Sequence, residues 1–185
     1  MSNKQKMNVI FVFLVIFLSL LLIHFAFPKE INVINSQHNK IDTDDNKEKS
    51  LIPSASYILT SPIDIDNTDP NKNWSKTAAE NAWCTGSGTW VDPYLIEDVM
   101  VIGNQTGFNL ITIRNSDVDF KIINCEIFNG SYPGDGIVLY NVTNGILIDN
   151  DIFECRRGIE LYSCNDIIIS GNTLFNLSHG IWYYE

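Results

Sequence analysis

Basic residues are scarce in this chain. Lysine and arginine number 12 against 22 aspartates and glutamates, which gives a formal net charge of −10. After residue 77 the only basic side chains are Arg114, Lys121, Arg156 and Arg157. A nucleic-acid surface needs clustered lysines and arginines opposite the phosphates, so we expect no binding to DNA or RNA. The excess acid is typical of a charge that keeps a protein soluble.

Ligands for soft metals are also scarce. The methionines are Met1, Met7 and Met100, and His179 is the only histidine after residue 94. Copper sites draw on Met, Cys and His, so the sequence predicts no metal site and no cofactor. The four cysteines lack the spacing of a zinc site. They fit either buried free thiols or one disulfide, which export would permit. They are Cys84, Cys125, Cys155 and Cys164.

Charge is absent from residues 9–27, a long apolar run that follows Lys4 and Lys6. A basic flank before about 20 apolar residues is typical of a signal peptide or of an uncleaved signal-anchor helix. No pair of small residues marks a cleavage site at its end, which favours the anchor. We therefore expect residues 1–28 to tether the chain to a membrane, with the remainder outside the cell.

Apolar residues are sparse between residues 29 and 56, where polar and charged side chains dominate. Such a segment cannot bury enough apolar surface to offset the entropy of ordering, so it predicts a disordered linker. Beyond it we expect an N-terminal capping module over residues 57–93 and a repeat domain over residues 94–185.

A repeat is the strongest positive signal in the sequence. Gly136, Gly158 and Gly180 are 22 positions apart, and each precedes an isoleucine and begins a short strand-forming segment that ends in tyrosine. A fixed period of this length predicts stacked repeats. The units lack the spaced leucines of leucine-rich repeats and the hairpin turns of a sandwich. They predict an all-β parallel helix of about four coils. The last coil lacks a polar cap, which predicts a truncated solenoid or an end that pairs with a partner.

Alternation of side chains along each strand predicts two outward columns on one face. Aromatic rings and a carboxylate on such columns are suited to binding carbohydrate, although a stack of rings can also serve only to stabilise the sheet. The candidate ligand-binding residues are Tyr140, Glu160, Tyr162, Trp182 and Tyr184. Asn150 and Asn172, also 22 positions apart, predict an asparagine ladder at a bend, which Asn124 could extend.

The units resemble the right-handed parallel β-helix repeats of the NosD-like and pectin-lyase-like superfamily. The resemblance rests on residues 123–127, residues 169–174 and the three Gly-Ile-x-x-Tyr strands, while residues 61–98 resemble the module that precedes such repeats in surface proteins. It implies a right-handed β-helix and leaves the function open. We expect an extracellular surface module that is structural or binds a polysaccharide or cell-surface glycan. Alternatives are a truncated or degenerate polysaccharide lyase or hydrolase and a NosD-like metal-delivery protein.

Two groups of charged residues are candidate sites. Lyases and hydrolases use carboxylates and basic residues together, but no paired Asp motif is found, so charges on turns are favoured. That group is Asp149, Asp151, Glu154, Arg156, Arg157 and Glu160. A calcium loop over Asp64, Asp66 and Asp69 lacks the closing Gly and Glu, so Asx-turns are favoured.

Five sequons predict N-glycosylation of an exported domain. They begin at Asn73, Asn104, Asn129, Asn141 and Asn176.

Overall fold

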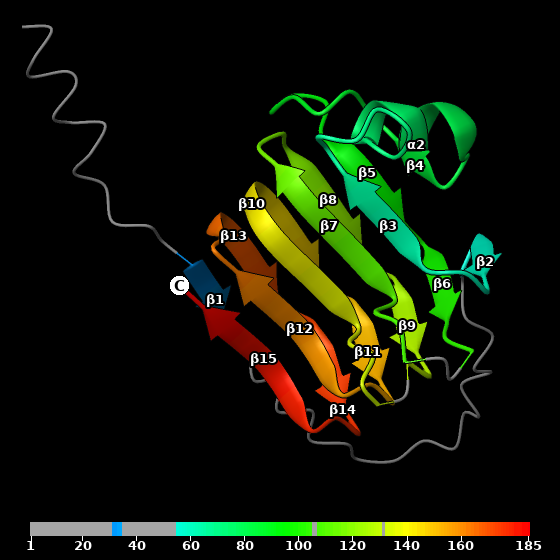
Figure 1. The fold of residues 1–185 in the computed structure, drawn as a ribbon, viewed down its shortest axis with the longest axis vertical. Coiled ribbons are helices and arrows are strands. Elements are labelled where there is room, and N and C mark those ends of the chain that lie inside the picture. The colour runs from blue at the N-terminus through cyan, green and yellow to red at the C-terminus, as the bar shows by residue number, and fades with distance from the viewer. Residues whose placement is uncertain (1–30, 35–54, 105–106, 131) are drawn as a thin grey trace, which may run out of the picture. The chain divides into compact units, whose positions relative to one another are not determined.

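The computed structural model describes residues 31–34, 55–104, 107–130 and 132–185. The predicted membrane segment at residues 9–27 and most of the predicted linker lie outside these ranges. Within the described ranges, no helix is both long enough and apolar enough to cross a membrane. The described residues belong to one compact unit, and their strands stack into a solenoid (Figure 1).

The strands lie in three sheets, which we call A, B and C. Sheet C contains β3 (Ile63–Asp66), β7 (Ile111–Ser116), the first half of β10 (Ile137–Ile148), β12 (Arg157–Tyr162) and β15 (His179–Tyr184). Sheet A contains β4 (Cys84–Thr85), β5 (Tyr94–Glu97), β8 (Phe120–Ile123), the second half of β10, β13 (Asn165–Ser170) and β1 (Ile31–Ile34). Sheet B contains β2 (Tyr57–Leu59), β6 (Val99–Ile102), β9 (Glu126–Phe128), β11 (Asp151–Phe153) and β14 (Thr173–Phe175).

In each coil the chain passes through sheet C, then A, then B. Every strand pairing is parallel except that of β4 with β5. Isoleucine, leucine and valine fill the interior, and most of these side chains are fully buried. The predicted all-β solenoid of about four coils is therefore confirmed, and the described residues add one short helix.

The bends between successive strands share a local pattern that was not predicted from the sequence. A residue with positive φ occupies the bend, and the next side chain points into the core. Asn124 (φ 53), Glu154 (φ 55) and Ser163 (φ 48) are each followed by a buried cysteine. Each of these thiols donates to the carbonyl two residues earlier, at 3.2–3.3 Å. All four cysteines are free, so of the two alternatives the structure has buried thiols.

The predicted asparagine ladder is present. The Asn172 Oδ1 accepts from the Asn150 backbone N–H at 3.0 Å, and the Asn150 Oδ1 accepts from the Cys125 backbone N–H at 3.0 Å. Cys125, not Asn124, continues the inward column, because Asn124 takes the positive-φ position and its side chain donates to Asp98 instead. These bonds satisfy buried backbone groups inside the bend.

The recurring glycines are explained by the stacking of the coils. A Cβ on Gly136 would lie 2.6 Å from the Gly158 carbonyl oxygen, and a Cβ on Gly158 would lie 2.7 Å from that of Gly180. Each glycine therefore admits the close approach of the next coil. A Cβ on Gly180 would meet nothing within 3.7 Å, because no coil of the described structure follows it.

The stacking of strands begins before residue 94, the predicted start of the repeats. Strands β2 and β3 pair in parallel with β6 and β7. The capping element is α2 (Trp74–Glu80), which leaves the solenoid after β3 and covers this end (Figure 1). Trp74 is fully buried, and its ring centroid lies 5.1 Å from those of Tyr94 and Phe120. The helix α2 is therefore the element that caps this end, while strands β2 and β3 already belong to the coils.

The predicted linker contains a strand. Ile31–Ile34 forms β1, which pairs in parallel with β13 in the last coil. The physical reason is the open edge of β13, whose backbone groups accept an additional strand. The correction applies to these four residues, and the other linker residues up to 54 lie outside the described ranges.

Candidate functional site

The predicted tyrosine column is present on sheet C. Tyr140 pairs with Tyr162, and Tyr162 with Tyr184, in neighbouring coils. Rings of Tyr162 and Tyr184 are parallel, with centroids 4.5 Å apart and an interplanar angle of 3°. Tyr140 is tilted by 45° to Tyr162 and is 51% exposed. Tyr184 is 37% exposed, so Tyr140 is the more exposed of these two rings.

The second column contains Val138, Glu160 and Trp182 in register, as the alternation predicted. Its carboxylate is not exposed, however: Glu160 is only 2% accessible. The Arg157 guanidinium forms an ion pair with it, and the Tyr162 hydroxyl donates to its Oε1 at 2.8 Å. Arg157 also lies over the Trp182 ring, 5.0 Å from the centroid. Long neighbouring side chains therefore cover Glu160, which sequence alternation alone could not show.

Asp135 joins this group, although it is not among the candidate residues that the sequence analysis named. Its carboxylate is 1% exposed and accepts from Arg156 through Nε at 2.8 Å and Nη2 at 2.5 Å. It also accepts from the Arg157 backbone N–H at 3.0 Å. A signal was present: aligned on Gly136 and Gly158, Asp135 falls one coil before Arg157. We call Asp135, Arg156, Arg157 and Glu160 the buried cluster.

Burial controls the electrostatics of this cluster. It raises the pKa of Glu160, and a hydrogen bond with Asp135 adds to the effect. It also raises the pKa of Tyr162 to about 12, together with the neighbouring Glu160 carboxylate. Hydrogen bonds from Arg156 to Asp135 raise the pKa of that guanidinium. In this cluster Asp135 is paired with Arg156 and Glu160 with Arg157, and the hydrogen bond to Glu160 fixes the position of Tyr162.

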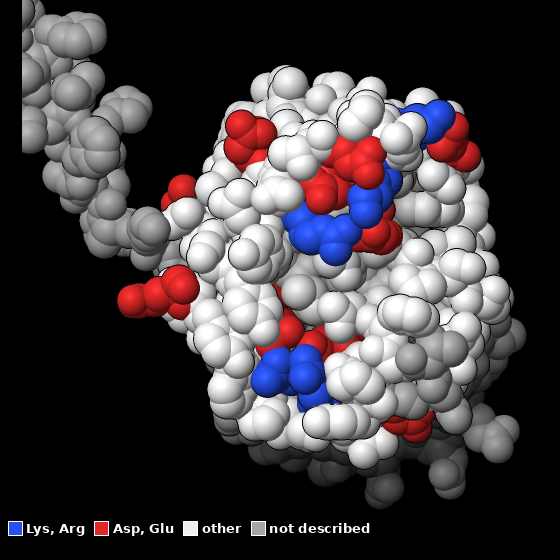
Figure 2. Space-filling view, viewed as in Figure 1, with Lys and Arg blue, Asp and Glu red and all other residues white. Residues whose placement is uncertain are grey.

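A second charged group lies on sheet C nearer to α2, and Figure 2 shows both on the same face. Asp64 accepts from Lys72 at 2.8 Å and from Arg114 at 2.6 Å. Asp66 is 3.5 Å from Arg114 Nε. We call these four residues the exposed cluster, because the Asp64 side chain is 44% accessible. Both clusters join residues of neighbouring coils.

Asx-turns are present at Asp66 and Asp69, two of the three aspartates in the run, whereas Asp64 pairs with Lys72 and Arg114. The Asp66 Oδ1 accepts from the Thr68 N–H at 3.1 Å, and the Asp69 Oδ1 accepts from the Asn71 N–H at 2.9 Å. The hydrogen bonds from Thr68 and Asn115 lower the pKa of Asp66 to about 2. In the described part of the chain, no group of three or more His, Cys, Asp or Glu residues is arranged to hold a metal.

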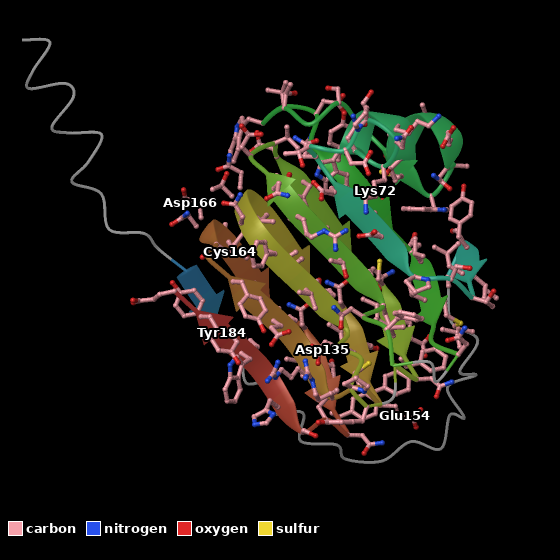
Figure 3. The ribbon with its side chains drawn as sticks, viewed as in Figure 1. Lys72, Asp135, Glu154, Cys164, Asp166 and Tyr184 are labelled. Carbon is pink, nitrogen blue, oxygen red and sulfur yellow. The ribbon has the colours of Figure 1, made fainter. Side chains whose placement is uncertain are left out.

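The charged residues considered for catalysis are separated by the fold. Arg156, Arg157 and Glu160 come together, whereas Glu154 lies exposed at a bend. Figure 3 shows Glu154 near the end of the strands and Asp135 over sheet C. Asp149 lies at the bend before β11, and Asp151 begins β11 on sheet B.

The sequons are in different surroundings. The Asn73 side chain caps α2 by accepting from the Lys76 N–H, while Asn129 donates to the Gly103 carbonyl and Asn141 donates to Asn115. Asn104 and Asn176 are exposed, and Asn176 occupies a bend with φ 52. Asn141 also occupies a bend and is exposed, so both bend positions are candidates for a glycan.

Comparison with known proteins identifies the family of the repeats. A family model described as a right-handed beta helix region matches residues 84–185, a little more than half of the chain. Searches of curated proteins and of solved structures gave no match.

Proposed function

The chain belongs to the right-handed β-helix family, and from this premise we propose that it is an extracellular surface module that binds carbohydrate along sheet C. The fold supports a structural or binding module. The finer proposal depends on one observation: tyrosines of three consecutive coils form a single column, with the Tyr140 ring 51% exposed at its inner end. Tyrosine combines an apolar ring with a hydroxyl group, so it can contact both the ring carbons and the hydroxyls of a sugar.

The buried cluster supports this proposal by fixing the geometry of the column. Tyr162 is held by its 2.8 Å hydrogen bond to Glu160, and Glu160 is held by Arg157. Side chains that are ordered before binding lose less conformational entropy when a ligand arrives. Successive coils are about 4.8 Å apart, so the column offers phenol groups at a regular interval along the axis. A regular row suits a chain of repeating sugars better than a single small ligand.

The direct test is binding to a panel of immobilised polysaccharides and glycans, with the full chain purified in mild detergent. We expect Tyr140→Ala to weaken binding by at least about tenfold, as for an interface hot spot. Tyr132→Ala is the matched control, because Tyr132 is 81% exposed and lies off the column. Equal binding by both variants, or no binding to any glycan, would contradict the proposal and favour a purely structural role.

We also propose that residues 9–27 tether the module to a membrane, with the folded part outside the cell. The support is the uncharged apolar run and its basic flank, together with the five sequons. The test is extraction of membranes with alkaline carbonate, combined with protease digestion of intact cells. Resistance to carbonate and sensitivity to protease are expected. A chain released by carbonate, or protected in intact cells, would contradict the proposal.

A truncated or degenerate polysaccharide lyase or hydrolase is the second candidate. It is favoured by one observation, the raised pKa of Glu160 beside a second acid, Asp135. The geometry gives it less support, because both carboxyl groups are almost inaccessible to solvent and are paired with Arg156 and Arg157. Glycosidases hold theirs roughly 5–9.5 Å apart, with the scissile bond between them. A reducing-end assay on the bound polysaccharides separates the candidates: cleavage that is lost in Glu160→Ala would make the chain an enzyme.

A further inference from the structure

The exposed ring of Tyr140 lies on a strand that is paired on both sides, so its exposure does not depend on where the solenoid ends. Strand β10 pairs with β7 in the preceding coil and with β12 in the following coil. Tyr140 is thus flanked in register by Arg114 on one side and by Tyr162 on the other. It is still 51% exposed. The residues around this ring therefore define which ligand the surface suits.

The amide of Asn141 is exposed next to this ring. Alternation along β10 would turn the side chain after Tyr140 inward, but the positive φ of Asn141 (53) returns it to the surface. The Asn141 Nδ2 donates to the Asn115 Oδ1 at 3.0 Å, and the Asn115 Nδ2 donates to the Asp66 Oδ1 at 3.1 Å. These bonds use one N–H of Asn141 and fix the plane of its amide. Its second N–H and its carbonyl oxygen are a donor and an acceptor in that plane.

The basic side chains on this face already have carboxylate partners. Within the described ranges there are four of them, in two groups, and Figure 2 shows uncharged surface between the groups. In the exposed cluster, Lys72 and Arg114 are balanced by Asp64 and Asp66. The buried cluster likewise contains two arginines and two carboxylates. In formal charge, the described part of sheet C therefore has no surplus cation to attract an acidic ligand.

The balance of the exposed cluster persists at neutral pH. Side-chain hydrogen bonds, first of all from Thr68, lower the pKa of Asp66 to about 2, which keeps its carboxylate ionised. A charge held over Tyr140 would interact with this cluster, because neighbouring strands are about 4.8 Å apart and charges interact over about 8 Å at physiological salt. An acidic sugar at this place would compete with Asp64 for Arg114 and would face the displaced carboxylate. Repulsion would therefore oppose its binding.

We propose that the carbohydrate of the proposed function, on which this step rests, is a neutral glycan rather than an acidic one, and that one sugar unit lies across Tyr140 and Asn141 beside Arg114. The ring carbons of the sugar pack on the phenol ring, and neighbouring hydroxyls bond to the Asn141 amide. A hydroxyl both donates and accepts, so it can join the Arg114–Asp64 pair without breaking it. A carboxylate only accepts, so it binds Arg114 only in competition with Asp64.

Neutral polysaccharides and their acidic copies test this selection directly. The probes are the neutral polymers of the panel, among them hydroxyethyl cellulose, galactomannan and starch. Each is compared with a copy in which primary hydroxyls are oxidised to carboxylates. The full chain is used in mild detergent, from a host that adds no N-glycan, because Asn141 begins a sequon. We expect oxidation to raise the dissociation constant by about tenfold or more, as for like charges brought together.

Two pairs of variants connect the selection to particular residues. Asp64→Asn removes the carboxylate that opposes an acidic sugar, so the ratio of acidic to neutral dissociation constants should fall by about tenfold. Asp151→Asn removes the same charge from sheet B and should leave the ratio unchanged. Asn141→Ala should weaken neutral binding by about three- to tenfold, typical of a lost hydrogen bond. Asn144→Ala is its control, because Asn144 also has a positive φ (60) but lies in the part of β10 that belongs to sheet A.

The outcomes separate a failure of the selection from a failure of the proposed function. Preference for the oxidised polymers, or equal binding to both copies, would overturn the selection while carbohydrate binding itself remained. A ratio that Asp64→Asn and Asp151→Asn change equally would also overturn it, by tracing it to the net charge. Equal losses in Asn141→Ala and Asn144→Ala would overturn the placement of the sugar. Binding to no polymer, neutral or acidic, would contradict the proposed function as well. Circular dichroism verifies that each variant is folded.

Discussion

The two charged clusters on sheet C contain the same kinds of residue, but in different solvent environments (Figure 2). In the exposed cluster, Asp64 is 44% accessible and accepts from two cations. In the buried cluster, Asp135 is 1% accessible and accepts two bonds from one guanidinium. Register between neighbouring coils creates both. We therefore expect solvent access, rather than the number of ion pairs, to decide what each cluster contributes to stability.

The largest expected effect separates the clusters directly. Asp135→Ala removes the partner of Arg156 and leaves the Arg157 backbone N–H without its acceptor. Loss of one member of a buried pair costs about 3–5 kcal/mol of unfolding free energy. Asp64→Ala, in water, should cost about 0–1 kcal/mol. Urea denaturation of both variants measures the difference.

Equal losses would contradict this comparison. They would mean that water reaches Asp135 as freely as Asp64, or that Asp64 is covered in solution. Asp135→Asn is a useful control, because it keeps the size of the side chain and one acceptor oxygen while removing the charge. We expect its loss to lie between those of the two alanine variants.

The clusters should respond to pH in opposite directions. The pKa of Glu160 is raised by burial, so the stability that its protonated form contributes is complete below about pH 4.5 and is lost as the pH rises through the folded pKa. The pKa of Asp66 is lowered from 3.8 to about 2, so its contribution is present above pH 3.8 and is lost as the pH falls toward 2.

Unfolding free energies of two variants test these signs. Glu160→Gln should gain stability relative to wild type as the pH rises from 4.5 to 7, because it carries no charge to bury. Asp66→Asn should be less stable than wild type at pH 5, and that deficit should shrink as the pH falls toward 2. If both differences vary in the same direction with pH, the two environments are not distinct.

A smaller effect concerns the bond between the buried cluster and the tyrosine column. Tyr162→Phe keeps the ring stack with Tyr184 but removes the hydroxyl that donates to Glu160 at 2.8 Å. We expect a loss of about 1.5–3 kcal/mol, typical of a hydrogen bond to a charged acceptor. Tyr140→Phe, at a half-exposed ring, should be nearly neutral. A neutral Tyr162→Phe would show that Arg157 alone holds Glu160.

The sequence predicted the coils because their repeat is local. Three glycines and the alternation after them set the coil length, the in-register tyrosines and the asparagine ladder. It missed the buried cluster, because the burial of Glu160 depends on how Arg157 and Tyr162 fold over it. Aligning Asp135 with Arg157 would have brought the two together, but not shown that water is excluded. Helix α2 and strand β1 were also missed, since each is positioned by contacts with residues far away in the sequence rather than by a local pattern.

The smallest effect tests whether water is the cause of the contrast. At 1 M salt the screening length falls to about 3 Å, so interactions between exposed charges are reduced while those between buried charges are much less affected. A double-mutant cycle on Lys72 and Asp64 should give a coupling of about 0.2–1 kcal/mol at low salt and almost none at 1 M. The cycle on Arg156 and Asp135 should remain large at both. Since the two pairs differ little in bond length, at 2.8 Å and 2.5 Å, a salt response that is the same in both would trace the contrast to geometry rather than to solvent.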